Sequence, residues 1–536
     1  MARNHTKYVN LNNPTESSPD IRNSGYSQAG ASKTKRSLKG FNARSSSPQE
    51  DIDFNNYTLR QRARILFMSA PLARSAIATN RTNVIGVGLK LKSRVDRKFL
   101  GLSAEAADEL QKHIEKEFDI WAGDRKGCDA IGVNDFYDQQ QLVFQSYLVN
   151  GDCFALVLHK DTDPLHPYSL RLHLIEADRV RTPNMDWQYS TEGKNEKTGN
   201  LIHDGVEVDS SGAIVAYHIA NYYPYSAECI KDNLKFERVQ AYGEKTGLPN
   251  VLHIMDAERP DQYRGVSYLA PVIEPLLQLR RYTESELTAA DIEACYAAFI
   301  KVTDGASENP FNSTVPEREY HDPDEYDLSA GTVNVMNVGE DVTFADPKRP
   351  NNGFGEFVKH VATLCGAALE IPRELLLKVF EASYSASRAA LLEAWKAFRM
   401  RRTWFINDFC RPVYEIWFAE AVARGRINAP GFFSSLLTRR AYLGADWIGP
   451  AQGMLDPTKE IQAEKDAIAE GFSTHQESTI KLGGGDWNEN IEILKSEMEQ
   501  RRAAGLPDKK DETFENAMDK KIDSRIRKDR EEQENG

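Results

Sequence analysis

Between about residue 57 and residue 149, apolar side chains recur every three or four positions along the chain. This is the period of a helix with one buried face, so the pattern predicts a helical region. Its clearest stripe consists of Leu110, Ile114, Phe118 and Trp121.

Between residues 152 and 256 the apolar period drops to two, which is typical of strands that bury one face. Five segments fit this period and are predicted to be strands: 153–158, 169–175, 205–209, 213–220 and 251–255. The sequence Asp209-Ser-Ser-Gly212 is rich in turn-forming residues and predicts a hairpin loop.

The helical period returns after Gly265 and predicts two helices that flank an acidic insertion. The first is expected from about Glu274 to Lys301 and the second over residues 355–369. The insertion contains a β-like hairpin, with residues 332–337 and 341–345 as its strands. Two helices around such an insertion are unusual in a compact domain and indicate a protruding stalk.

A long helix is predicted from Ser385 to about Ala423. We expect a kink at Pro412, because proline removes one backbone hydrogen bond and crowds the preceding turn. Two amphipathic helices are predicted over residues 458–470 and 487–502. The large apolar residues of the long helix are expected in the core or in a subunit interface: Leu391, Trp395, Phe398, Phe405, Phe409, Val413, Ile416 and Trp417.

The composition is that of a globular chain of 536 residues with a net charge of −13, which is long enough for more than one domain. The acidic balance argues against a protein that grips nucleic acid over its whole surface. The six cysteines form no CxxC pair, so a reducing compartment is expected. Neither a signal peptide nor an apolar run long enough to span a membrane is recognised.

The two ends of the chain are polar. Residues 1–50 are nearly free of large apolar side chains, and we expect a disordered basic arm there. Residues 507–536 form a second polar tail. Two groups of arginines between the tails are interpreted as surface residues: Arg60, Arg62 and Arg64 as a solvated helix face, and Arg399, Arg401 and Arg402 as a helix surface or inter-subunit ion pairs.

The search for catalytic motifs is negative: the sequence contains no GxxxxGK[ST], HExxH or GxSxG pattern. His159, His166 and His173 are interpreted as loop and sheet residues in preference to metal ligands. The acidic cluster of Asp322, Asp324, Glu325 and Asp327 resembles a nuclease carboxylate set, but a solvated loop is favoured because prolines surround it. No cofactor, metal site or catalytic residue is assigned.

Ten segments, taken in order, are similar to a known family. They are Asn150–Phe154, Ile175–Arg179, Ala216–His218, Arg264–Ile273, Ala362–Leu369, Glu370–Arg373, Ser383–Trp395, Phe409–Tyr414, Trp447–Pro450 and Asp456–Glu460. Together they resemble the lambda-like family of tailed-bacteriophage portal proteins over roughly residues 60–505. No single segment is specific, but their order and spacing make coincidence improbable.

The resemblance implies a structural protein without enzymatic activity. It would form a homo-oligomeric ring, usually a homododecamer, at one vertex of the capsid. A separate terminase would pump double-stranded DNA in through the axial channel of this head–tail connector, and the genome would later leave by the same path. Implied partners are the chain itself, the terminase large subunit, the major capsid or scaffold protein, the head-completion (neck) proteins and the passing DNA, with no membrane. The implied location is the virion, and the host cytoplasm during assembly.

The resemblance also implies a layout of wing, stem, clip and crown. Carried onto this sequence, it gives a disordered basic arm (1–50), wing (51–265), stem helix (266–303), clip (304–350), second stem helix (351–370), tunnel loop (371–385), kinked helix with wing return (386–455), crown helices (456–506) and polar tail (507–536).

A mostly acidic lumen with few cations would let a polyanion slide without trapping it. Arg373, Lys378 and Arg388 are therefore the candidates for contacts to DNA in the channel. The resemblance places Asp322, Asp324, Glu325 and Asp327 in the clip, which would face the terminase and later the connector proteins.

Two alternatives remain open from the residues alone. One is a metal-dependent nuclease or another packaging-associated hydrolase, which would use the acidic cluster around Asp324. The other is a helical adaptor that binds one partner and forms no ring.

Overall fold

In the residues that the computed structural model describes, the chain is mainly helical with four small sheets, as expected for an α+β chain. The structure describes residues 30–32, 35–41, 45–183, 192–224, 226, 234–294, 298–302, 340–344, 353–380, 383–453, 456–483 and 485–505. Within these residues, no helix is both long and apolar enough to cross a bilayer.

The first helices lie where the apolar period predicts them. They are α1 (Pro48–Ser69), α2 (Pro71–Val84), α3 (Arg97–Leu100), α4 (Ala104–Ala122), α5 (Arg125–Cys128) and α6 (Phe136–Asn150). Ser47 starts α1 with a capping box, and Pro71 at the first position of α2 separates the two helices.

The β-rich region forms two antiparallel sheets that face each other across a small apolar core. One sheet has the order β3-β2-β9 (Leu170–Glu176, Asp152–His159, Val251–Met255). The other has the order β4 to β8 (Glu192–Lys194, Leu201–His203, Val206–Val208, Ile214–Ala220, Phe236–Gln240). The five predicted strands are all present, and the predicted loop at Asp209–Gly212 joins β6 to β7.

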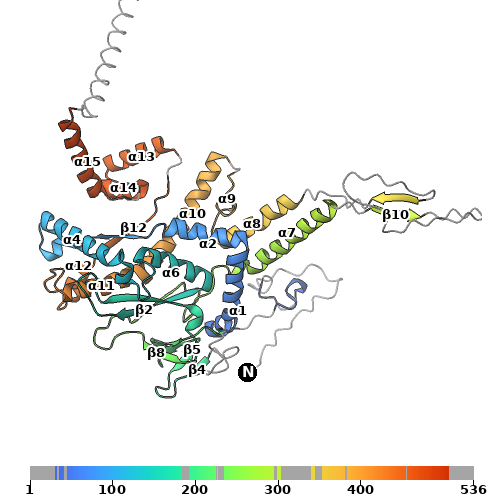
Figure 1. Ribbon diagram of the computed structural model, residues 1–536, viewed down its shortest axis with the longest axis horizontal. Helices are drawn as coiled ribbons and strands as arrows, with labels where there is room; N and C mark the ends of the chain where they lie inside the picture. The colour runs from blue at the N-terminus through green and yellow to red at the C-terminus, as the bar shows by residue number, and fades with distance from the viewer. Residues whose placement is uncertain are drawn as a thin grey trace, which may run out of the picture.

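Two helices leave this body as a pair (Figure 1): α7 (Ile273–Ala294) and α8 (Phe354–Ala368). The expected helix to Lys301 is wrong, because α7 ends at Ala294 and β10 (Ala298–Val302) follows. β10 pairs with β11 (Glu340–Phe344), which corresponds to the predicted second strand of the hairpin. Alternating apolar residues in Ala-Phe-Ile-Lys-Val favour a strand over a helix. The predicted strand 332–337 lies outside the described residues.

The long helix after α9 (Arg373–Leu377) is made of three parts. A regular helix, α10 (Tyr384–Phe405), continues into a π-helical turn (Ile406–Cys410) and then into α11 (Arg411–Ala423). Pro412 lies at the start of α11, which explains why the regular hydrogen-bond pattern changes just before it.

The chain then returns to the body and ends in a separate group of helices. α12 (Leu436–Tyr442) and β12 (Ala445–Ile448), which pairs with β1 (Lys90–Ser93), complete the body. Last come α13 (Pro457–Ala469), α14 (His475–Gly483) and α15 (Trp487–Ala503). Asp456 caps α13 as its sequence suggests, and α14 is a helix that the pattern missed.

The main core brings together aromatic residues from distant parts of the sequence. The ring of Phe118 lies 5.0 Å from that of Trp417 and 5.9 Å from those of Tyr414 and Trp447, between centroids. Trp121 and Phe136 extend the same cluster. The predicted stripes of α4 and α11 therefore pack against each other.

Candidate functional site

The pair of helices α7 and α8 begins at a joint built around Arg264. This side chain has no exposed area and lies between the two sheets and α1. It donates two hydrogen bonds to the Asp152 carboxylate, at 2.6 and 3.2 Å, and others to the carbonyl oxygens of Val180 and Ala177, at 2.8 and 3.0 Å. The Asp204 carboxylate lies 2.7 Å from the guanidinium. One buried arginine thus fixes the segment that leads into α7.

The charges at this joint shift each other's pKa values. Burial alone would raise the pKa of Asp152, but the Arg264 guanidinium and the His253 ring outweigh it and hold that pKa well below its usual range. Burial would lower the pKa of Arg264, but the carboxylates of Asp152 and Asp204 raise it. For Asp53, burial raises the pKa to about 7, and the nearby Asp204 adds to the increase. The joint therefore contains one carboxyl group that titrates near neutral pH.

Arg60 belongs to the same joint, which corrects its interpretation as a solvated residue. It is 2% exposed and lies 3.0 Å from Asp204 and 3.5 Å from Asp178. Arg64 also pairs with Asp178, at 2.5 Å. Only Arg62 of the three arginines is exposed as expected. A three-arginine cluster could not reveal this, because the acidic partners lie more than 100 residues away in sequence.

Two glycines let the backbone pass closely at the joint. A Cβ atom on Gly151 would lie 2.5 Å from the carbonyl oxygen of Gly265, and one on Gly265 would lie 2.0 Å from that of Gly151. Gly151 also has a φ of +94°, which favours glycine. Both glycines stand in the segments that carry the family resemblance, and this contact gives a physical reason for them.

The loop after α8 is held by Arg401 of α10. Its guanidinium donates to Glu370 at 2.6 Å and to Asn80 at 3.0 Å, and it lies over the ring of Tyr268 at 4.9 Å. The Tyr268 hydroxyl in turn donates to the carbonyl oxygen of Leu369. Arg401 is 6% exposed, so its interpretation as a surface residue is wrong.

Arg402 is likewise an internal residue. It donates to the carbonyl oxygens of Asn83, Val84 and Pro450, at 2.7 to 2.9 Å. Burial lowers the pKa of Arg402 to about 10, and neighbouring Arg399 contributes to the decrease. Together, Arg401 and Arg402 fix α10 to the end of α2.

Two residues of the loop adopt left-handed backbone conformations that non-glycine residues rarely take: Glu370 at φ +51° and Lys378 at φ +56°. Between them, Ile371 and Leu376 are buried, and Ser75 of α2 donates to the carbonyl oxygen of Leu376 at 2.7 Å. The anchored side chains hold this strained backbone in place.

The three predicted channel cations take different positions. Arg373 starts α9, keeps about a third of its side chain exposed and lies 3.4 Å from Glu374. Lys378 ends α9 and is exposed. Arg388 lies 3.4 Å from Glu460 of α13, so part of its charge is already compensated. Whether any of the three faces DNA stays a prediction.

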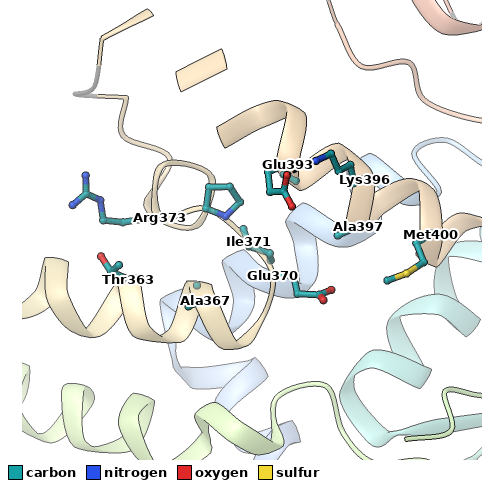
Figure 2. A pocket seen from close by; sticks show the side chains of 12 residues that line it. Thr363, Ala367, Glu370, Ile371, Arg373, Glu393, Lys396, Ala397 and Met400 are labelled. Carbon is teal, nitrogen blue, oxygen red and sulfur yellow. Dashed lines mark hydrogen bonds and ion pairs between the residues drawn. The ribbon is translucent and has the colours of Figure 1, made fainter. Parts of the chain in front are cut away.

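A groove of about 520 Å³ separates the loop from α10 (Figure 2). Thr363, Ala367 and Ile371 lie on one wall and Ala397 and Met400 on the other. Figure 2 shows Arg373 extending away from α10, while Glu393 and Lys396 lie together on α10, 2.7 Å apart. The sequence interpretation did not identify the ion pair between Glu370 and Arg401. These two residues lie 31 positions apart, so no local pattern in the sequence indicates that they meet.

The acidic cluster Asp322, Asp324, Glu325 and Asp327 lies outside the described residues. His166 lies beside Asp124, and His159 contacts Ser169, so these two histidines have ordinary polar partners. In the described part of the chain, no three His, Cys, Asp or Glu side chains group as a metal ion requires.

Comparison with known proteins matches a family described as phage portal protein, lambda family, over residues 34–402. The portal protein of Escherichia phage N15 is 24% identical over 490 residues, which cover 88% of this chain and 89% of that protein. Portal protein B of Escherichia phage lambda is 23% identical over 489 residues, covering 86% and 87%.

Among solved structures, the chain is similar to the neck of a native GTA particle computed with C12 symmetry. The TM-score is 0.41 and the identity 13%, with 81% of this chain and 94% of that chain covered. The neck of an empty GTA particle, computed with C6 symmetry, gives a TM-score of 0.41 at 14% identity, with the same coverage.

Proposed function

Because the chain belongs to the lambda family of phage portal proteins, we propose that its copies close into a ring, a dodecamer, around a channel for double-stranded DNA. The ring would stand at one capsid vertex of the virion. A terminase would drive DNA inward through it, head-completion proteins would later bind it, and the capsid or scaffold protein would hold it. The proposal assigns this chain no reaction of its own.

The layout of the chain supports this proposal. The paired helices α7 and α8 project from the body as a stem would (Figure 1), with β10 and β11 at their far ends where a clip would begin. Tyr282 of α7 packs on Phe357 of α8 with 4.8 Å between ring centroids. Helices α13–α15 stand apart from the stem, at the position that we assign to the crown.

The loop between α8 and α10 is the proposed channel element. Arg401 fixes the start of the loop through Glu370, and Ser75 donates a hydrogen bond to the carbonyl oxygen of Leu376, so the exposed Lys378 and the partly exposed Arg373 extend from an anchored backbone. A few presented cations in an acidic protein would centre DNA without holding each phosphate. Arg388 is expected to contribute less, because Glu460 already neutralises part of its charge.

The single observation that carries the proposal is the family match over residues 34–402, which is more than half of the chain. Electron microscopy of the purified full-length chain tests it. We expect rings with a central hole and one rotational symmetry. Soluble particles that are only monomers or open filaments would overturn the proposal.

The channel contacts have a separate test. The double variant Arg373→Ala and Lys378→Ala should still form rings but package DNA less efficiently, since both side chains lie outside the anchored core. Arg62→Ala, an exposed arginine on α1, is the matched control and should leave packaging unchanged. Equal packaging by the double variant and the control would show that Arg373 and Lys378 make no functional contact with DNA in the channel.

A further inference from the structure

Helices α4 and α12 lie at the end of the body away from α7 and α8 (Figure 1). A groove of about 730 Å³ is lined by residues of α3, α4 and α12 and of the segment before α12. Its walls combine apolar side chains such as Leu102, Leu110 and Tyr442 with polar ones such as Glu109 and Arg426. The groove has the size and lining of a site for several side chains of another molecule.

Large apolar side chains stand exposed at this end of the body. Phe433, Leu436 and Leu437 are 67%, 65% and 64% exposed, and Phe99 in the groove is 53% exposed. A grouping of this kind marks an interaction surface. A groove of mixed lining with exposed apolar side chains beside it can bind an amphipathic helix, which offers an apolar stripe and charged neighbours.

The charge around the groove indicates an acidic occupant. Residues 421–445 contain four arginines and no aspartate or glutamate, in a chain whose net charge is −13. Arg424 and Arg426 pair with Glu420 and Glu117. At the end of α12, Arg439 and Arg440 have no carboxylate within ion-pair distance among the described residues. On the facing wall Glu109 of α4 lines the groove, and Arg97 and Lys98 of α3 directly precede the lining residue Phe99.

The chain itself contains a helix of the complementary kind. On α15, residues 491–500 are all exposed, including Ile491, Leu494 and Met498, which lie three and four positions apart on one face. The same ten residues include three glutamates and one lysine. An exposed apolar stripe with acidic neighbours fits an apolar groove with basic neighbours.

Within one chain, α15 contacts a face of α4 other than the one that lines the groove. It is fixed at its start by Asp486, which lies 2.8 Å from Lys92, and further along by an ion pair between Glu492 and Lys112 of α4. The groove uses a different face of α4, carried by Ala106, Glu109, Leu110 and His113. Lys112 lies about 100° around the helix from that face.

We propose that α15 of a neighbouring copy docks into this groove, with its Ile491, Leu494 and Met498 side chains on the exposed apolar residues of α12. This inference rests on the proposed ring, in which each copy presents two different surfaces to its two neighbours. It adds a specific contact: the terminal helices of one subunit bind the far end of the body of the next.

Cross-linking between singly substituted copies tests the contact. Copies that carry Leu437→Cys are co-expressed with copies that carry Leu494→Cys and are treated with a short bismaleimide. We expect a cross-linked dimer from the mixture and not from either variant alone. Leu287→Cys, which replaces a 62% exposed leucine on α7 at the other end of the body, is the matched control and should give no dimer with Leu494→Cys.

The same sample is imaged by electron microscopy. This distinguishes a failure of the docking proposal from a failure of the proposed ring. Rings without the cross-linked dimer overturn the docking and leave the ring intact. An intrachain product from the double variant Leu437→Cys and Leu494→Cys, without the dimer, also overturns it. The absence of rings contradicts the proposed function instead.

Charge reversal gives an independent measurement. Arg439→Glu with Arg440→Glu should reduce the yield of the cross-linked dimer roughly fivefold at low salt, because residues 491–500 of the docking helix carry three glutamates and one lysine. Lys245→Glu, an exposed residue far from the groove, should not change it. An unchanged yield in the double arginine variant would contradict the charge complementarity on which the docking rests.

Discussion

The aromatic cluster around Phe118 and the group of helices α13–α15 are stabilised by different interactions. Phe118 is 1% exposed and contacts rings from α4, α11 and β12. In α13–α15 the residues that become buried are polar: Glu464, Ser478 and Asp486. Glu464 accepts a hydrogen bond from Ser478 at 2.8 Å, and the ring of His475 stacks on that of Trp487 at 4.4 Å.

This difference indicates how much each region depends on other subunits. The cluster around Phe118 removes large apolar area from water within one chain, so it stabilises the body without a partner. The group α13–α15 has little apolar burial of its own and exposes the stripe of α15. Its position is therefore set by a few polar contacts in one chain and, under our proposal, by a neighbouring copy.

The largest effect is expected at the charged joint of the body. Arg264→Met leaves the buried carboxylates of Asp152 and Asp204 without their partner, which should lower the free energy of unfolding by roughly 3–5 kcal/mol. Guanidinium denaturation followed by tryptophan fluorescence measures the change. Arg62→Met, at an exposed position, should stay near wild type; a similar loss in both variants would mean that the joint does not stabilise the body.

The second largest loss of stability is expected in the aromatic cluster around Phe118. A variant there tests directly whether the body has an apolar core that the group α13–α15 lacks. Phe118→Ala should cost roughly 3–5 kcal/mol, because a large buried ring leaves a cavity. Phe472→Ala, at a phenylalanine after α13 that is 85% exposed, should cost less than about 0.5 kcal/mol. Equal losses would contradict the view that only the body has an apolar core. Should Phe118→Ala not fold, Phe118→Leu should show a smaller loss of the same sign.

Stability should also depend on pH through Asp53. Its pKa is raised to about 7 by burial, above its ordinary value of 3.8, so the folded chain binds this proton more tightly than the unfolded chain. The stabilisation is complete below pH 4 and is lost as the pH rises to 7. Asp53→Asn cannot ionise and should be more stable than wild type by about 1–3 kcal/mol at pH 8, with a smaller difference at pH 5.

Thermal melts at the two pH values check this prediction. Glu196→Gln, an exposed residue of the β-rich region, serves as the control for removing one carboxylate. A gain that is equal at pH 5 and pH 8 would show that Asp53 ionises normally in the folded chain.

The smallest effect on global stability is expected for the connection to α13–α15. Lys92 lies 2.8 Å from Asp486 and 3.3 Å from Glu115. Burial would lower the pKa of Lys92, but these two carboxylates raise it above its usual value. The Lys92 and Asp486 side chains are only 12% and 7% exposed, so Lys92→Ala leaves a buried carboxylate without its partner. Because Asp486 belongs to the group α13–α15, the loss should act mainly on those helices and change the unfolding of the body by no more than about 1 kcal/mol.

Hydrogen exchange should nevertheless show a local change in Lys92→Ala. The amides of α14 and α15 should lose protection while those of α4 keep it, since few other contacts hold these helices. Lys465→Ala, on the exposed side of α13, is the control. Unchanged protection in Lys92→Ala would mean that α13–α15 are held by contacts other than Lys92.

The local pattern of the chain was enough to predict α4, α8, α13, α15 and the strands of the β3-β2-β9 sheet, because each has a clear apolar period and a terminating residue such as Gly471. The local pattern gave a wrong prediction at residues 298–302, which were assigned to the end of a helix. This segment is a strand that pairs with another strand about 40 positions later. The local pattern also missed α14, whose mixed composition has no strong period. The family resemblance was confirmed, while the channel and clip residues stay predictions.

What the sequence alone determined is the set of elements and their family, since periods, caps and ordered motifs are local properties of the chain. Only the tertiary structure decided the roles of the charged residues. The sequence assigns Arg60 and Arg401 to the surface and gives Arg264 no role beyond a family segment, yet each is buried against carboxylates contributed by other segments. The physical reason is that burial and charge pairing depend on which segments meet in space, which no local pattern records.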